Sequence, residues 1–130
     1  MATGDHKWRA PVGSGRFPAV RALGISERLG WPFRSFALVT KSLVLVVQAG
    51  YQSNTRPAVT TPWRRVHDLN NVEPKLYAYD KATGALVAEV PLPSNASGAP
   101  ITYMAGGKQY VVFPVGGANV TEELVALTLP

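Results

Sequence analysis

The chain has 130 residues, 46% of them hydrophobic and 16% charged, which is the composition of a folded domain and not of a disordered tail. It contains no cysteine, which excludes disulfides, thiolate nucleophiles and cysteine-ligated zinc or iron–sulfur centres. The formal net charge of +5 would suit an acidic partner. Because the basic residues are mostly scattered singly, outside any recognisable nucleic-acid module, we expect no nucleic-acid partner.

The opening residues carry a motif that recurs later in the chain. Thr3-Gly4-Asp5-His6-Lys7-Trp8 matches residues 83–88 in its Thr-Gly pair, with Ala88 in place of the tryptophan. Self-similarity of this kind indicates an array of repeats, which usually needs about three or more units to be stable. Too few units are present here, so we expect the chain to be a piece of a longer protein.

Residues 9–35 hold four glycines and three prolines, which predicts a mostly irregular connection with a weak helical segment near 19–23. Gly13-Ser14-Gly15-Arg16 has the composition of a phosphate-binding loop. It lacks the Gly-Lys-Ser/Thr end and a preceding strand, so a flexible connection is the favoured interpretation.

Short segments rich in Val, Leu, Tyr and Thr, separated by turn residues, predict an all-β fold. The segments 36–40 and 43–48 are almost continuously apolar, which indicates that both faces are covered. We therefore expect the hairpin that they form to lie deepest in the fold. The longest uncharged apolar run, residues 43–47, is far below the ~18 residues of a membrane span. The predicted strands are residues 36–40, 43–48, 76–80, 85–90, 101–104, 109–113 and 123–129.

Two turns and one insertion connect these strands. In the turn at residues 81–84, Asp80 and Thr83 can bond turn amides and Gly84 can take a positive φ, so Asp80 is a structural cap and not a catalytic carboxylate. The turn at residues 105–108 is again glycine-based. The polar insertion at 49–75 has the length of a functional loop and is the expected place for contacts specific to the parent protein.

Other potential sites are weakly supported. His6 and His67 are the two histidines and have no suitably spaced partner, which favours surface positions over metal ligation. Asn95-Ala96-Ser97 and Asn119-Val120-Thr121 match the glycosylation acceptor pattern, which often occurs by chance.

Residues 78–88 resemble the motif Ala-x-Asp-x-x-Thr-Gly-x-x-x-Trp, which lies between the third and fourth strands of the blades in eight-bladed quinoprotein propellers. They match all of it except the tryptophan. In that family the tryptophan docks between neighbouring blades. The resemblance therefore implies that Trp8 fills such a site for a preceding blade and that Ala88 leaves its own site underfilled.

The tail carries the more specific match. Residues 76–84, Pro100-Ile101-Thr102-Tyr103-Met104, Gly107-Lys108-Gln109-Tyr110 and Gly116-Gly117 resemble the C-terminal end of pyrroloquinoline-quinone (PQQ)-dependent dehydrogenases of the glucose and alcohol type. Residues 38–43 are similar to the innermost hairpin that precedes this tail. The resemblance implies a partial β-propeller of about two four-stranded antiparallel blades. Its expected parts are 1–35, the end of a preceding blade and a connection; 36–91, one blade with the insertion at 49–75; and 92–130, an incomplete closing blade.

The resemblance also implies a periplasmic oxidoreductase that passes electrons from a sugar or alcohol to PQQ, held with calcium in the central channel. The implied partners are the upstream blades and the substrate. The family's catalytic, cofactor and metal motifs match no position here, so we assign no such residue and expect the chain to be inactive by itself.

Trp31-Pro32 could approach the channel mouth, although a packed loop aromatic is favoured. The alternative function is a non-catalytic propeller segment that serves as a protein-interaction scaffold.

Overall fold

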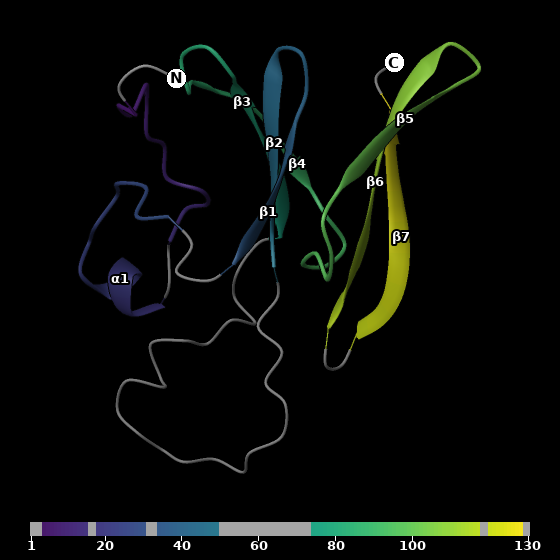
Figure 1. The fold of residues 1–130 in the computed structure, drawn as a ribbon. Coiled ribbons are helices and arrows are strands. Elements are labelled where there is room, and N and C mark those ends of the chain that lie inside the picture. Colours follow the sequence, from purple (N-terminus) through teal and green to yellow (C-terminus); the bar gives the residue numbers. More distant parts are fainter. Residues whose placement is uncertain (1–3, 16–17, 31–33, 50–73, 118–119, 129–130) are drawn as a thin grey trace.

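The computed structural model describes residues 4–15, 18–30, 34–49, 74–117 and 120–128, and they form a nearly all-β structure (Figure 1). Two antiparallel sheets lie side by side, a first sheet with strand order β1-β2-β3-β4 and a second with order β5-β6-β7. Neither sheet closes on itself, as expected for part of a propeller. The elements are α1 Pro18–Ala22, β1 Ser35–Val39, β2 Leu43–Gln48, β3 Lys75–Asp80, β4 Leu86–Pro91, β5 Ile101–Ala105, β6 Lys108–Gly117 and β7 Val120–Thr128.

The main core lies between the two sheets. Alternate residues of β2 and β3 point toward the second sheet, where Phe113 and Val115 of β6 meet them with 1% of their surface exposed. Such close-packed apolar burial is the main stabilising contribution to the fold. The buried members of this core are Leu45, Val47, Leu76, Ala78, Leu92, Ala96, Phe113 and Val115.

The other face of the first sheet is also covered, here by the N-terminal segment. Val46, Tyr77 and Tyr79 are buried on this face and pack with Ala10 and Val12. Strands β2 and β3 are therefore buried on both faces, which explains why β2 is almost continuously apolar.

Strand β1 differs from the prediction that the first hairpin lies deepest in the fold. Its residues alternate between exposed and half-buried, because it is an edge strand with a single neighbour, β2. Val39, for example, is 63% exposed. The most deeply buried pair of strands is β2–β3. The apolar residues of β1 predicted that both of its faces would be covered, but its alternate residues remain exposed.

A short segment joins the two sheets. The Ala96 amide donates to the Gln48 carbonyl at 2.9 Å, and the Ser97 amide donates to the Pro114 carbonyl at 3.0 Å. Ala96 thereby bridges Ala49 at the end of β2 and Val115 in β6. Backbone hydrogen bonds thus hold the sheets together beside the apolar core. In the part of the chain that the structure describes, no helix has the length and apolar character needed to span a membrane.

Candidate functional site

The turn between β3 and β4 is built around Asp80. Its carboxylate oxygen Oδ1 accepts hydrogen bonds from the amides of Ala82 at 2.9 Å and Thr83 at 2.7 Å, and from the Thr83 hydroxyl at 2.8 Å. The Thr83 hydroxyl bond, followed by the Thr83 amide bond, lowers the pKa of Asp80 below its usual value. Asp80 is therefore a turn cap, as the sequence predicted.

Trp8 docks on this turn. Its indole nitrogen Nε1 donates to the Lys81 carbonyl at 3.0 Å, and its ring lies over Gly84. Gly84 has φ 75°, and a Cβ at this position would be 2.6 Å from Trp8 Cδ2. Glycine is thus required both by the backbone conformation and by the ring above it. The resemblance implied a docking role for Trp8, and the structure adds its partner, the turn at residues 81–84.

Ala88, which occupies the tryptophan position of the second motif, makes no equivalent contact in the described residues. It pairs with Ala78 across β3 and β4, so it shares the face that turns toward the second sheet. The residue is nevertheless exposed. That Ala88 leaves an inter-blade packing site underfilled remains a prediction.

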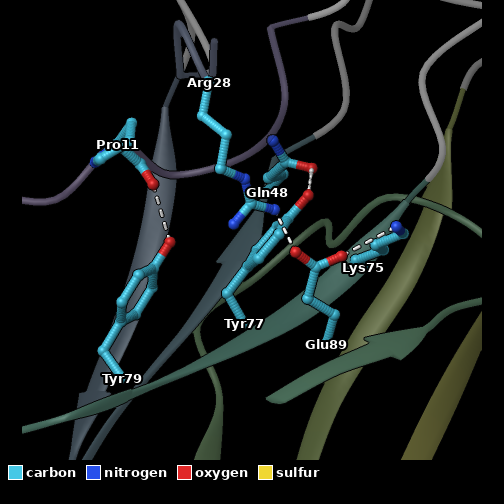
Figure 2. A network of polar contacts seen from close by, with 7 residues as sticks. All are labelled: Pro11, Arg28, Gln48, Lys75, Tyr77, Tyr79 and Glu89. Atoms are coloured by element: carbon cyan, nitrogen blue, oxygen red, sulfur yellow. Dashed lines mark hydrogen bonds and ion pairs between the residues drawn. The ribbon is translucent and has the colours of Figure 1, made fainter. Parts of the chain in front are cut away.

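A charged cluster lies on the N-terminal face of the first sheet (Figure 2). Glu89 of β4 forms ion pairs with Arg28 and with Lys75 of β3, the latter at 2.9 Å between Nζ and Oε2. The hydrogen bond from Lys75 is the main cause that lowers the pKa of Glu89, and Arg28 acts in the same direction. Two cations from different parts of the chain therefore hold one carboxylate.

Two tyrosines extend the cluster across the same face. The Arg28 guanidinium lies over the Tyr77 ring, 5.6 Å from its centroid, and the Tyr77 hydroxyl donates to Gln48 Oε1 at 3.5 Å. The Tyr79 hydroxyl donates to the Pro11 carbonyl at 2.9 Å, and burial raises the pKa of Tyr79. These contacts fasten the N-terminal segment to the sheet, as Figure 2 shows.

The contacts given above are packing contacts, hydrogen bonds and ion pairs. Among the described residues, no group of three or more His, Asp or Glu side chains lies together in a way that could hold a metal ion. His6 is exposed. The absence of catalytic, cofactor and metal residues from the chain remains a prediction. His67, Trp31-Pro32, Asn119 and positions 50–73 of the insertion lie outside the described residues.

The glycine-rich segment at 13–16 is a packed connection in its described part. Gly13 and Gly15 are buried, and the Leu29 amide donates to the Ser14 carbonyl at 3.2 Å. A Cβ on Gly15 would lie 2.6 Å from the Gly30 carbonyl oxygen. Gly15 therefore permits a close approach of the two backbones, which explains this glycine without a phosphate ligand.

Sequence reasoning missed the charged cluster. Arg28 and Glu89 are 61 residues apart, and neither belongs to a motif. The available signal was Glu89 itself, a carboxylate within a strand of otherwise apolar residues. Such a charge needs a partner when it is partly buried, but its position does not reveal which cation supplies one.

Comparison with known proteins identifies the family. The model for the PQQ family, described as the glucose/ethanol/alcohol dehydrogenase β-propeller domain, matches residues 1–111. The chain therefore belongs to this family of PQQ-dependent oxidoreductases, as its tail motifs predicted, and the family implies PQQ as the cofactor of the parent protein. The two sheets are accordingly part of a propeller.

Two relatives from Gluconobacter oxydans (strain 621H) resemble the chain. The glycerol dehydrogenase large subunit is 27% identical over 130 residues, covering 95% of this chain and 15% of that protein. The quinoprotein glucose dehydrogenase is 38% identical over 58 residues, covering 41% of this chain and 7% of that protein. No solved structure matches the chain. The chain thus spans a small part of the length of the curated relatives it matches.

Proposed function

We propose that this chain is a C-terminal portion of a PQQ-dependent dehydrogenase that oxidises a sugar or an alcohol, and that it is inactive by itself. The observation that carries the proposal is the docking of Trp8 on the turn that contains Lys81 and Gly84, which supports the inter-blade role that the resemblance implies for this tryptophan. The names of the two relatives, a glycerol and a glucose dehydrogenase, support the substrate class.

The proposed parts are two neighbouring blades and the end of a third. Residues 36–91, with the insertion at 49–75, form one blade; 1–35 are the end of the preceding blade and a connection; 92–130 are an incomplete closing blade. The four strands of the first sheet support the complete blade. Val12, which covers one face of this sheet, and Trp8, which docks on its β3–β4 turn, support a preceding one.

The strand counts support the assignment of an incomplete closing blade. In the described residues, the second sheet has three strands, β5, β6 and β7, whereas the first sheet has four.

In this proposal, the reaction centre lies on upstream blades of the parent protein, which is periplasmic. When bound, PQQ accepts the two electrons of the substrate, and calcium polarises the quinone. The residues of this chain help to close and stabilise the propeller that holds them. The insertion at 49–75 supplies contacts specific to the parent protein.

The test is cofactor-dependent dye reduction by the purified chain, with PQQ and calcium chloride and with glucose, glycerol or ethanol as substrate. We expect no turnover, whereas the longer reading frame that contains the chain should reduce the dye under the same conditions. Turnover by the chain alone would refute the proposed inactivity. A longer reading frame without carboxylates for the metal and the base would favour the alternative, a non-catalytic scaffold.

A further inference from the structure

The second sheet has one face packed on the first sheet and one face that points away from it. Phe113 and Val115 of β6 lie in the core between the sheets, so the residues that alternate with them along β6 point outward. The register of β5 and β7 with β6 places further residues beside these on the same side. We call this surface the outer face, and its large apolar members are Ile101, Tyr103, Tyr110, Val112, Pro114 and Leu124.

The outer face is open to water. Ile101 is 60% exposed, Tyr103 is 45% exposed and Leu124 is 75% exposed. Tyr103 and Tyr110 stack across the strands with 5.3 Å between their ring centroids, which gives the face a fixed aromatic surface. The second sheet stands at one side of the molecule in Figure 1. A contiguous exposed apolar surface of this kind marks a contact with another molecule.

The inner face of the same sheet shows how such a surface is buried in this protein. Phe113 of β6 lies in one core cluster with Leu45 and Val47 of β2, so a sheet covers a sheet. Packed sheets interdigitate their side chains at a separation of about 10 Å and keep their strand directions within about 30° of one line. A second flat sheet surface therefore fits the outer face, with its strands either parallel or antiparallel to those of the second sheet.

Charges of opposite sign lie at the two ends of the outer face. Lys108 begins β6 at its hairpin with β5, and the alternation along β6 places it on this face. Glu122 of β7 lies at the other end, because a Cβ on Gly116 would be 2.8 Å from Glu122 Cγ. Lys108 and Gly116 span most of β6, which is about 26 Å of extended strand. The face thus has a positive end, an apolar middle and a negative end.

Two copies of this face fit each other in one of the two orientations. With antiparallel strands, a two-fold axis passes near Val112, midway along β6, and Lys108 of each copy lies over Glu122 of the other. With parallel strands, Lys108 would lie over Lys108 and Glu122 over Glu122, which like-charge repulsion disfavours. Charge complementarity therefore points to a second copy of the chain, in the antiparallel orientation, as the occupant of the outer face.

We propose that the outer face is a self-association surface: two copies of the 130-residue chain pack their outer faces together, with antiparallel strands, in a two-fold symmetric dimer. A contact of this symmetry is closed, so assembly through it stops at two copies. The net charge of +5 on each copy opposes association, and a three-stranded face is small for an interface. The dimer is therefore reversible and depends on concentration. The inference concerns this chain by itself and does not depend on the proposed dehydrogenase activity.

Sedimentation velocity of the full 130-residue chain tests the proposal. We expect a monomer at about 1 μM and a dimer at about 100 μM, as for a weak interface. Leu124→Lys should weaken dimerisation about tenfold or more, because it replaces a buried apolar side chain of the contact by a cation. The matched control is Leu23→Lys: this leucine is also 75% exposed but lies outside both sheets, and its replacement should leave dimerisation unchanged.

Charge reversal tests the orientation. Lys108→Glu and Glu122→Lys should each weaken the dimer, because each places like charges over one another, and the double variant should restore it. A chain that stays monomeric at about 100 μM overturns the proposal. It is equally overturned by assemblies larger than a dimer, by a dimer that Leu124→Lys leaves intact, or by single charge reversals without effect.

Discussion

Replacing Gly84 by alanine tests whether the docking of Trp8 depends on the missing side chain at that position. The new Cβ would occupy a backbone with φ 75° and lie 2.6 Å from Trp8 Cδ2. The left-handed conformation alone costs about 1–2 kcal/mol for a residue with a Cβ. The overlap also expels the indole, so the variant loses the docking contact as well.

The docking contact has its own magnitude. The bond from Trp8 Nε1 to the Lys81 carbonyl contributes about 1 kcal/mol net. Burial of part of the indole adds about 1 kcal/mol, less than full burial would provide because Trp8 is half-exposed. We therefore expect Trp8→Ala to reduce the free energy of unfolding by about 2 kcal/mol and Gly84→Ala by about 3–4 kcal/mol.

A double-mutant cycle distinguishes the two contributions. With Trp8→Ala already present, Gly84→Ala should cost only the backbone strain of about 1–2 kcal/mol, so the double variant resembles Gly84→Ala alone. The assay is urea denaturation of the four proteins followed by circular dichroism. Equal effects of Gly84→Ala in the two backgrounds would refute the reasoning, because the ring and the Cβ would then not compete for the same space.

Three further outcomes are expected. Phe113→Ala should lower the free energy of unfolding by about 3–5 kcal/mol in the same denaturation assay, because the ring is 1% exposed in the core between the sheets; a loss below about 1 kcal/mol would mean that this core is loosely packed. Tyr79→Phe should cost about 1 kcal/mol, since the Pro11 carbonyl loses its donor, and exchange of the Ala10 and Val12 amides should rise; unchanged exchange there would contradict the role of this bond. The folded pKa of Asp80 is lowered, so its contribution to stability is present above its ordinary pKa and is lost as the pH falls toward the folded value. Asp80→Asn should therefore flatten the acid side of the stability–pH curve, and an unaltered curve would contradict that assignment.

Local features were accessible from the sequence. Asp80, Thr83 and Gly84 specify a turn through hydrogen bonds between residues at most four positions apart, and the structure reproduces it. The pair Gly106-Gly107 likewise forms the expected hairpin turn, with φ of 55° and 76°. Such turns depend on few residues, so the chain can be interpreted there without knowledge of the whole fold.

Long-range features were less accessible. The exposure of β1 depends on its place at the edge of the sheet, which its apolar residues do not encode. The contact of Arg28 with Glu89 depends on how the N-terminal segment crosses β3 and β4. The motif implied that Trp8 has a docking role, whereas its partner, the turn at residues 81–84, became known only from the structure.

The pairing of β2 with β3 has a consequence for the variability of the insertion. Val47 is paired with Leu76, so the backbone that leaves the sheet after Gln48 and the backbone that returns at Lys75 are adjacent strands. The bridge from Ala49 to Ala96 anchors the departing end. A loop whose ends are fixed in this way can lengthen at a small entropic cost, about 0.6 kcal/mol for each doubling. The length of this insertion can therefore change between related proteins without shifting the register of the sheet that carries it.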